Sequence, residues 1–532
     1  MKTDKLLGVM LDCSRDAVYT VETLKNYFRL LKKMGYNSVQ LYTEDTYEIE
    51  GEPYFGYLRG RYSKSELKEL NTYAEDMGIE LIPCIQTLAH LGGITRWAEY
   101  RGITDTGDIL LVGEERTYEL IEHMFQTCAE CFTSRRINIG MDEAHMVGLG
   151  AYLDKHGYQN RFDILLEHLQ RVCKIAEKYG FKPMMWSDMF FRLANKGKYF
   201  VSECEIPQRV IDSVPENVEL IYWDYYSPDK SHYDGMIKSH KQFRNSIVFA
   251  GGARSWDGFA PYNRFSIGAC RAAMQSCTEN GIGNIFITCW KDDGAECSLY
   301  SSVPTLFYAA QTARGKTDEA ELEKEFQKFT GLKVSDFLAL DSINLCKWDE
   351  IKNPCKYMLY NDPFLGIFDA TAEGHSGKEF TTVKKALSSG EKSTRYGYIF
   401  KTLAALCDVL EIKYTLGIRT REAYQKHEIE TLHALIEEYK ELEKRLKKFY
   451  KRFAEQWHRE CKPNGFEKQD IRLGGLIQRV NHCRERLKEY CEGKLCSLPE
   501  LDENILPFGG VPSGYSILYD NWLENSMIKP KM

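Results

Sequence analysis

Short apolar runs alternate with longer amphipathic segments from the start of this chain to about residue 312. Within the runs, polar and apolar residues do not alternate, so the runs suit strands of a sheet that is covered on both faces. Eight such units predict an α/β fold, the (β/α)8 TIM barrel. The expected strands are Leu7–Asp12, Ser38–Tyr42, Ile79–Ile85, Ile137–Gly140, Pro183–Ser187, Val218–Trp223, Ile247–Gly251 and Asn284–Trp290. The helices expected between them include Val21–Met34, Lys64–Met77, Tyr118–Phe132, Arg161–Tyr179, Ser231–Phe243 and Ile267–Asn280.

The remainder of the chain carries no strand rhythm. Glu428–Gln456 is a long charged segment with apolar residues at helical spacing, and Ile471–Tyr490 is a second helix candidate. With 532 residues the chain is too long for one simple core. We therefore expect two domains, a barrel over 1–315 and a mainly α-helical C-terminal domain over 316–532. The apolar stripe of the long helix needs a partner, either another helix or a second copy of the chain in a homodimer.

The composition argues against several classes of partner. The 70 basic and 77 acidic residues give a net charge of −7, which offers no electrostatic basis for binding nucleic acid or an anionic membrane. No apolar run approaches the roughly 20 residues of a membrane span, and no signal peptide precedes the first expected strand. The 17 cysteines form no disulfide framework, and the one metal-like spacing, Cys128-x-x-Cys131, falls inside a helical pattern. We therefore expect a cytoplasmic protein with reduced thiols and with neither metal nor organic cofactor.

Charged and aromatic residues gather where the expected strands end, which in a barrel of this kind is the active-site face. The pair Asp142-Glu143 directly follows the fourth strand. Two adjacent carboxylates are costly where a buried strand meets a loop, and such a pair usually serves chemistry in which the two groups titrate differently. The strand ends also supply Asp12, Arg15, Glu44, Asp45, His90, His145, Trp186, Asp188, Trp223, Tyr225, Tyr226, Arg254, Trp256, Asp257, Trp290, Asp292 and Asp293.

This combination of side chains suits a sugar substrate. The C–H faces of a sugar ring pack on indole, and sugar hydroxyls bind to charged, bidentate partners. Cleavage of a glycosidic bond needs an acid for the leaving oxygen and a second group that stabilises the oxocarbenium-like centre. Several carboxylates and four tryptophans at one barrel mouth therefore indicate a glycosidase.

Several separated motifs resemble glycoside hydrolase family 20, the β-N-acetylhexosaminidases. The stretch Gly140-Met141-Asp142-Glu143 is similar to the Asp-Glu signature of that family, and Gly8–Arg15 with Val21–Lys25 resembles its first strand, arginine and helix. Tandem acids after the second strand, a histidine after the third and a late Trp followed by an acid also fit, so the likeness covers roughly residues 5–312. The resemblance implies an exo-acting, retaining β-N-acetylhexosaminidase that removes terminal non-reducing β-linked GlcNAc or GalNAc. In that substrate-assisted mechanism the carbonyl oxygen of the sugar's own 2-acetamido group is the nucleophile.

The same resemblance implies a role for each residue of the site. Glu143 is expected to act as the general acid and then as the base for water, while Asp142 holds the acetamide N–H and stabilises the positive intermediate. Either Tyr225 or Tyr226 is expected to donate a hydrogen bond to the acetamide oxygen. The remaining assignments are Trp186, Trp223 and Trp290 as walls of the acetamide pocket, Trp256 as a rim or leaving-group contact, Arg15 with Asp292 or Asp293 at the 3- and 4-hydroxyls, and Asp45 with His90 as a relay that orients and tunes Glu143.

The chain departs from the family pattern at three points. Asn138-Ile139-Gly140-Met141 stands where the family usually has His-x-Gly-Gly, and Thr87-Leu88-Ala89 precedes His90 in place of a Pro-Gly pair. The small β-rich domain that commonly precedes such a barrel is not expected, since the first strand begins close to Met1. These differences suggest a divergent intracellular subgroup that acts on small oligosaccharide or glycoconjugate fragments.

Two other functions are compatible with the same residues. One is a retaining glycosidase with two catalytic carboxylates, and the other is a non-catalytic barrel that binds sugar. The turn-rich stretch Lys462–Gly475 in the helical half is a candidate for covering the barrel mouth or for a dimer contact. A helicase interpretation of Asp142-Glu143-Ala144-His145 fails because Ala310 stands where a P-loop needs glycine.

Overall fold

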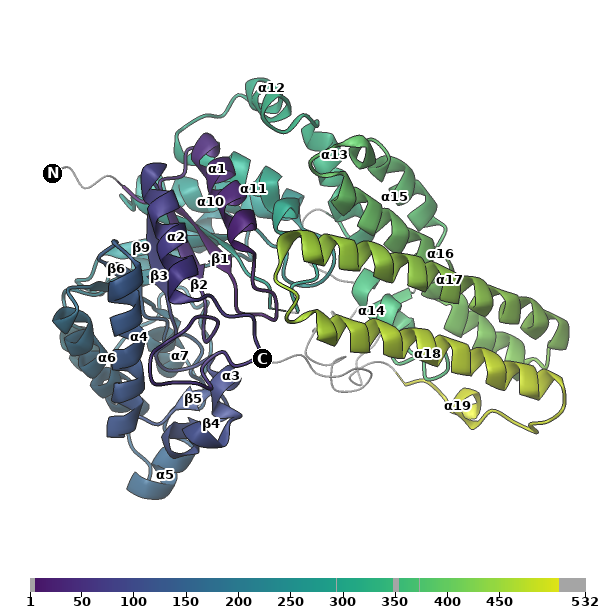
Figure 1. Cartoon of the computed structure of the whole chain (residues 1–532), viewed down its shortest axis with the longest axis horizontal. Coiled ribbons are helices and arrows are strands. Elements are labelled where there is room, and N and C mark those ends of the chain that lie inside the picture. The colour runs from purple at the N-terminus through teal and green to yellow at the C-terminus, as the bar shows by residue number, and fades with distance from the viewer. Residues whose placement is uncertain (1–4, 293, 348–353, 373, 507–532) are drawn as a thin grey trace.

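Eight parallel strands close into a barrel in which neighbours follow the order of the chain (Figure 1). The computed structural model describes residues 5–292, 294–347, 354–372 and 374–506. The last strand pairs with the first, with Leu7 opposite Ile285, and this pair closes the barrel. The predicted TIM barrel is therefore confirmed. The barrel strands are β1 (Leu7–Asp12), β2 (Ser38–Tyr42), β3 (Glu80–Cys84), β6 (Arg136–Asn138), β7 (Lys182–Trp186), β8 (Glu219–Trp223), β9 (Ile247–Gly252) and β10 (Asn284–Cys289).

Amphipathic helices cover the outside of the barrel. In α1 the hydroxyl of Thr20 caps the first turn by accepting from Thr23 N, and Gly35 ends the helix in the left-handed conformation at φ 98°. The predicted helices match the observed ones to within a few residues at each end. The helices around the barrel are α1 (Val21–Met34), α2 (Lys64–Asp76), α4 (Glu115–Cys131), α6 (Arg161–Lys178), α7 (Asp188–Ala194), α8 (Gln208–Ser213), α9 (Lys230–His240), α10 (Asn263–Glu279) and α11 (Val303–Ala313).

The long connection between β3 and α4 contains structure that the sequence patterns did not predict. It holds the one-turn helix α3 (Gly92–Thr95), a 3₁₀ turn η1 (Ala98–Ile103) and a small antiparallel hairpin of β4 (Thr104–Thr106) and β5 (Ile109–Leu110). Strands of two or three residues are too short to show a hydrophobic period. The buried carboxylate of Asp105 joins this hairpin to the loop before α5 (Ala151–His156) by accepting from three backbone N–H groups, those of Gly148, Gly150 and Tyr152.

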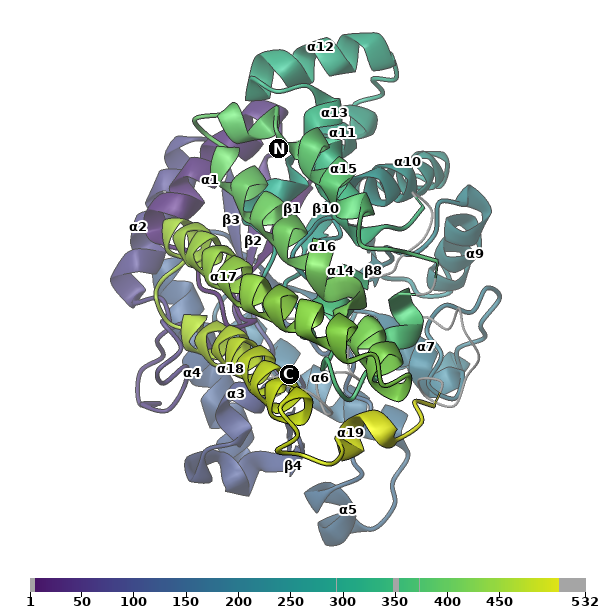
Figure 2. The ribbon, with the colours of Figure 1, turned by 90° about the vertical axis from the view of Figure 1, so that its right-hand side faces the viewer.

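The rest of the described chain is helical, and three long antiparallel helices dominate it (Figure 2). These are α16 (Gly397–Gln425), α17 (Ile429–Glu460) and α18 (Phe466–Cys491). Leu435, Leu442 and Phe449 of the apolar stripe on α17 are buried, and α17 packs on α16 and α18 of its own chain. The long helix thus has partner helices within the chain, whereas the homodimer stays a prediction. The shorter helices are α12 (Glu319–Thr330), α13 (Val334–Leu338), α14 (Pro354–Tyr360), α15 (Glu379–Leu387) and α19 (Pro499–Asp502).

The boundary predicted at residue 315 falls between α11 and α12. Among the helices that the structure describes, none combines the length and the apolar content that a membrane crossing would require.

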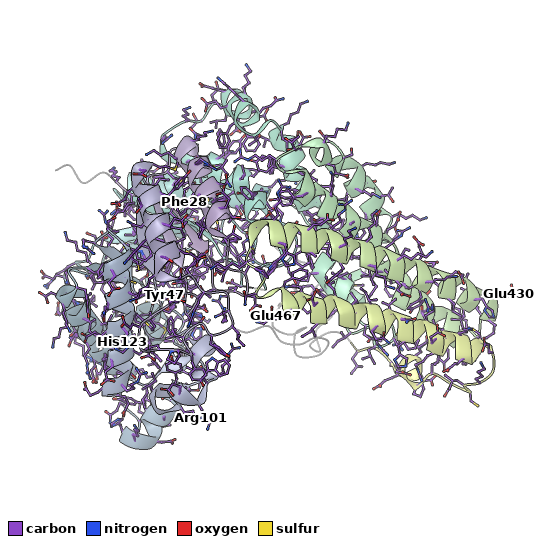
Figure 3. All side chains as sticks on the ribbon, in the orientation of Figure 1. Phe28, Tyr47, Arg101, His123, Glu430 and Glu467 are labelled. Atoms are coloured by element: carbon purple, nitrogen blue, oxygen red, sulfur yellow. The ribbon has the colours of Figure 1, made fainter. Side chains whose placement is uncertain are left out.

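The turn between α17 and α18 brings the helical part onto the barrel. Figure 3 labels Glu430 at the far end of the helical part and Glu467 at the junction, so α17 runs from the tip toward the barrel. At the junction Lys462 N donates to Val18 O at 2.7 Å, and Asn464 Nδ2 donates to Leu58 O at 3.1 Å. Both acceptors lie in loops that follow barrel strands β1 and β2, which are the loops of the active-site face. The turn-rich stretch therefore contacts this face of the barrel.

Candidate active site

A pocket opens at the carboxyl ends of the barrel strands, with about 520 Å³ of space that includes solvent at its mouth. Seven of the eight barrel strands contribute at least one wall residue, either at the strand's own carboxyl end or in the loop that follows it. The pocket brings together eleven of the twelve residues predicted for the site, namely Arg15, His90, Asp142, Glu143, Trp186, Trp223, Tyr225, Tyr226, Trp256, Trp290 and Asp292.

The carboxylate pair is presented by a tight turn after β6. Gly140, Met141 and Glu143 all have left-handed backbone, with φ of 73°, 72° and 49°. This conformation is strained for the two residues that carry a Cβ, and such strain concentrates at functional sites. A Cβ on Gly140 would lie 2.0 Å from Gln86 Oε1, so only glycine fits there. The turn is held because Met141 N donates to Gln86 Oε1 at 3.2 Å.

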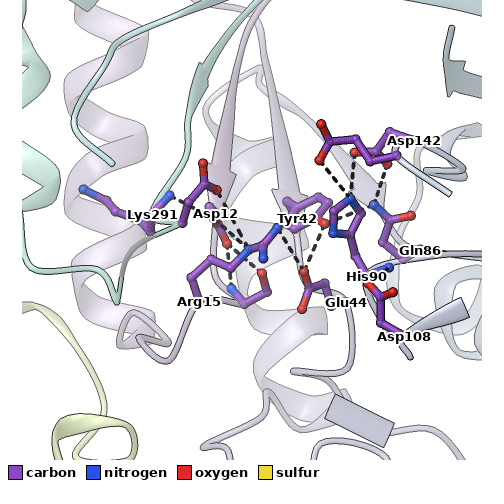
Figure 4. A network of polar contacts seen from close by, with 12 residues as sticks. Asp12, Arg15, Tyr42, Glu44, Gln86, His90, Asp108, Asp142 and Lys291 are labelled. Atoms are coloured by element: carbon purple, nitrogen blue, oxygen red, sulfur yellow. Dashed lines mark hydrogen bonds and ion pairs between the residues drawn. The ribbon is translucent and has the colours of Figure 1, made fainter. Parts of the chain in front are cut away.

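Asp142 is buried and is surrounded by groups that favour its ionised form (Figure 4). Gln86 Nε2 donates to its Oδ1 at 2.7 Å, and His90 Nε2 lies 3.3 Å from its Oδ2. Burial alone would raise the pKa of Asp142, but the charge of His90 and the hydrogen bonds outweigh it and lower that pKa below its usual value. Burial likewise disfavours the charged imidazole, yet Asp142 raises the pKa of His90 to about 10. At neutral pH the two side chains form an ion pair.

Glu143 faces the open side of the pocket, and 38% of its side chain is exposed. Arg192 Nη2 donates to Glu143 Oε1 at 3.1 Å, and Arg192 Nε donates to Asp188 Oδ2 at 2.8 Å. Asp188 also accepts from Glu143 N at 3.1 Å. Burial raises the pKa of Asp188 to about 7, although Arg192 opposes this shift. The backbone and the carboxylate of Glu143 are thus both held by the Arg192–Asp188 pair.

Aromatic side chains form much of the pocket wall. Trp223 stacks on Tyr225 with ring centroids 5.5 Å apart, and Trp256 meets Tyr225 edge to face at 5.4 Å. Trp290 Nε1 donates to the hydroxyl of Tyr225 at 3.0 Å. The indole N–H of Trp186 is buried and has no hydrogen-bond partner among the described residues, which is uncommon for a buried donor. Tyr225 is buried in this wall, whereas Tyr226 is 43% exposed at the rim.

Arg15 and Asp292 lie close together in the wall of the pocket. Arg15 Nε lies 4.0 Å from Asp292 Oδ1 and 3.9 Å from Asp12 Oδ2, and Arg15 Nη2 lies 3.5 Å from Glu44 Oε1. Arg15 Nε is buried and makes no hydrogen bond in the described structure. Burial raises the pKa of Asp292 to about 7 against the opposing effect of Arg15. A donor and an acceptor therefore lie close together without bonding each other. The alternative candidate, Asp293, lies outside the described residues.

Asp45 is the one predicted site residue that does not line the pocket. Its buried carboxylate pairs with Arg59, which also donates to Ser14 O. The carboxylate nearest to His90 Nε2 is Asp142 at 3.3 Å, with Glu143 at 3.8 Å. Asp45 thus forms an ion pair that fixes its loop, and His90 lies closer to Asp142 than to Glu143.

Three residues that hold the carboxylates were not singled out from the sequence. Gln86 is the first polar residue after β3, and a strand-end position was its only signal. Asp188 was noted at a strand end without a role, and Arg192 was not noted because it lies one turn into the short helix α7. Among the described residues, no group of three or more His, Cys, Asp or Glu side chains has the arrangement of a metal site.

Comparison with known proteins adds a family. The model "Glycosyl hydrolase family 20, catalytic domain" matches residues 7–230, and the model "Glycoside Hydrolase 20C C-terminal domain" matches residues 335–516. Hexosaminidase D of Homo sapiens is 25% identical over 214 residues, which are 38% of this chain and 42% of that protein. Hexosaminidase D of Bos taurus is 25% identical over 213 residues, 38% of this chain and 58% of that protein. The chain thus spans about half the length of these curated relatives.

Two solved structures are similar to the chain at lower sequence identity. The GH20 exo β-N-acetylglucosaminidase of Vibrio harveyi has a TM-score of 0.48 and 15% identity, over 64% of this chain and 59% of that one. The β-N-acetylhexosaminidase of Bacteroides fragilis has a TM-score of 0.48 and 19% identity, over 61% of this chain and 69% of that one.

Proposed function

Because the chain belongs to glycoside hydrolase family 20, we propose that it is an exo-acting β-N-acetylhexosaminidase that releases terminal non-reducing β-linked GlcNAc or GalNAc with retention. One observation carries the proposal. An ionised Asp142 lies in an indole-walled pocket directly beside Glu143, whose side chain is more exposed. A buried fixed negative charge suits a positive intermediate that forms deep in the pocket, and a more exposed carboxyl suits contact with the leaving group.

In the first step Glu143 donates a proton to the glycosidic oxygen while the acetamide carbonyl oxygen attacks the anomeric carbon. The C–O bond to the leaving group breaks, and a cyclic oxazolinium ion forms. Asp142 accepts the acetamide N–H, and its charge stabilises the cation. Tyr225, whose hydroxyl accepts a hydrogen bond from Trp290 Nε1, donates a hydrogen bond to the acetamide oxygen and keeps its proton. In the second step Glu143 removes a proton from water, and the water oxygen bonds to the anomeric carbon. The bond between that carbon and the acetamide oxygen breaks, which regenerates the acetamide.

The remaining wall residues bind the sugar. Trp186, Trp223 and Trp290 offer apolar faces to the ring and to the acetamide methyl group. Arg15 and Asp292 offer a donor and an acceptor to the 3- and 4-hydroxyls, and their separation of 4.0 Å leaves both able to bond the sugar. We propose that Trp256 and the exposed Tyr226 contact the leaving group. The substrate on this account is a small oligosaccharide or a glycoconjugate fragment.

Hydrolysis of an aryl β-N-acetylglucosaminide, measured beside the matching aryl β-glucoside, tests the proposal. The wild type is expected to turn over only the acetamido sugar, and Glu143→Gln is expected to lose that turnover. Equal turnover of both sugars would instead indicate an enzyme nucleophile and a two-carboxylate mechanism. Absence of turnover with retained sugar binding would indicate a non-catalytic barrel.

A further inference from the structure

The loop that follows β10 belongs both to the active site and to the interface with the helical part. Its first residues, Trp290 and Asp292, line the pocket. Its next residues, Gly294 to Leu299, are held by side chains from α14, α17 and α18, far away in the sequence. Figure 1 shows the turn between α17 and α18 lying next to the barrel.

Two amides of the helical part bond directly to the backbone of the loop. Gln469 Nε2 donates to Gly294 O at 3.1 Å, and Gln456 Nε2 donates to Glu296 O at 3.3 Å. Gln469 is fully buried and Gln456 is 5% exposed. Within the described part of the chain, Gln469 Oε1 is buried and has no hydrogen-bond partner. Burial of this side chain therefore costs free energy that its one hydrogen bond to the loop only partly offsets.

A buried charge cluster fixes the next residue of the loop. The carboxylate of Glu296 lies between Lys356 Nζ at 2.5 Å and Arg472 Nη1 at 3.0 Å, and all three side chains are buried. Buried ion pairs add little stability compared with apolar packing, but they tolerate few alternative geometries. The cluster therefore fixes where Glu296 sits relative to α14 and α18.

The end of the loop is fixed in the same way. The buried carboxylate of Glu460, at the last turn of α17, accepts from Leu299 N at 2.9 Å and from the hydroxyls of Ser298 and Tyr398. Tyr398 Oη lies 2.6 Å from it. The loop is thus bonded to the helical part at 294, 296 and 298–299.

The loop backbone needs such support. Gly294 and Ala295 have φ of 91° and 56°, and the left-handed conformation is unfavourable for alanine. A Cβ on Gly294 would lie 3.0 Å from Arg472 Nη1, so α18 packs directly on the loop backbone. Asp292 lies two residues before this point and has Arg15 as its neighbour at 4.0 Å.

We propose that the helical part is a specificity element of the active site, in which Gln469, Gln456 and the Glu296–Lys356–Arg472 cluster set the position of Asp292 against the hydroxyls of the terminal sugar. These side chains are positioning residues that act through the loop. The inference rests on the proposed function, because it assigns to Asp292 a bond to the sugar. It predicts that contacts made more than 150 residues away in the sequence determine how well the enzyme binds its terminal sugar.

A double-mutant cycle on the full chain tests this inference. Gln469→Met keeps the volume of the side chain and removes its bond to Gly294 O. We expect it to raise KM for an aryl β-N-acetylglucosaminide and the Kd for free N-acetylglucosamine about tenfold, with a much smaller change in kcat. In the Asp292→Asn background the same substitution should change both constants less than twofold. Gln456→Met provides a second, independent variant, with the same pattern expected.

The matched control is Asn464→Leu. The side-chain amide of Asn464 also donates a hydrogen bond to a backbone carbonyl of the barrel part, at 3.1 Å, but its acceptor is Leu58 O in the loop after β2. The Asn464→Leu variant should leave KM and Kd unchanged. Thermal denaturation of every variant identifies loss of folding.

An equal effect of Gln469→Met and Asn464→Leu, or independent effects of Gln469→Met and Asp292→Asn, would overturn the inference. Since Kd needs no turnover, a wild type that binds the sugar without hydrolysing it contradicts only the proposed function, whereas a wild type that does neither overturns both.

Discussion

His90 Nε2 lies 3.3 Å from Asp142 Oδ2, and this contact keeps a buried negative charge in the wall of the pocket. His90 itself has left-handed backbone at φ 57°, and its backbone N–H donates to Asp108 Oδ2 at 3.0 Å. The imidazole is thus anchored from the loop between β3 and α3, and it faces the carboxylate presented by the turn after β6. Each partner shifts the pKa of the other toward its charged form. On our account this ion pair supplies the charge that the oxazolinium ion requires.

Replacement of Asp142 by Asn should lower kcat for an aryl β-N-acetylglucosaminide by about 10²- to 10³-fold. The amide keeps the shape of the side chain but removes the negative charge that stabilises the cation. Steady-state kinetics at neutral pH check this outcome. An Asp142→Asn enzyme with wild-type kcat would show that the charge is not used in the chemical step.

The His90–Asp142 pair predicts how the free energy of unfolding depends on pH. The raised pKa of His90, about 10 against an ordinary 6.5, gives stability that is fully present below pH 6.5 and is lost as pH rises toward 10. The lowered pKa of Asp142 gives stability that is present above its ordinary 3.8 and is lost as pH falls further. The stabilising contribution of the pair is therefore greatest between about pH 4 and pH 6.5.

Urea unfolding of the wild type and of His90→Gln from pH 5 to pH 10 checks this dependence. The stability gap between the two proteins should be largest near pH 5 to 6 and should shrink as pH rises. A gap that stays constant across this range would contradict the ion pair.

Replacement of Arg192 by Met should lower kcat about tenfold, because Glu143 then loses the donor that orients its carboxylate. KM should change little, since Arg192 does not line the pocket. The matched control is Arg171→Met on α6, where the arginine pairs with the exposed Glu115 instead. Both kinetic constants of the control should equal those of the wild type. If kcat for Arg192→Met equals that of the control, Arg192 does not orient Glu143 for catalysis.

Substitution of Gly140 by Ala should abolish activity, because the added Cβ would lie 2.0 Å from Gln86 Oε1 and displace the turn that presents Asp142. Gly180→Ala is the matched control. Gly180 has nearly the same φ, 72° against 73°, but a Cβ there meets no atom within 4 Å. Both variants should lose about 1 kcal/mol of stability from the left-handed strain. Only Gly140→Ala should lose activity, as measured by parallel kinetics and thermal denaturation.

The barrel was predictable because each strand is a separate apolar run and each helix has a strong 3.6-residue period. Leu7–Asp12 and Ser38–Tyr42 match the observed strands at both ends. The hairpin of β4 and β5 was missed because its strands have three and two residues, fewer than a periodic pattern needs.

The wall of the pocket was also predictable, because parallel strands in a barrel end on one face and Trp or charged residues stand at those ends. The residues that hold Asp142 and Glu143 in place were not predictable. The contact between Arg192 and Glu143 depends on the direction of the short helix α7, and the hydrogen bond from Gln469 to Gly294 depends on how the helical part packs on the barrel. Asp45 and Glu44 are adjacent in the sequence, and only the turn after β2 decides that Asp45 meets Arg59 while Glu44 meets Arg15.

The central claim is that the substrate's own acetamide is the nucleophile. The most direct test is hydrolysis of a series of aryl β-glucosaminides whose N-acetyl group carries zero, one, two or three fluorine atoms. Fluorine withdraws electrons from the carbonyl oxygen, so kcat/KM should fall steadily along the series if that oxygen attacks the anomeric carbon. A kcat/KM that does not change with fluorination would contradict the account.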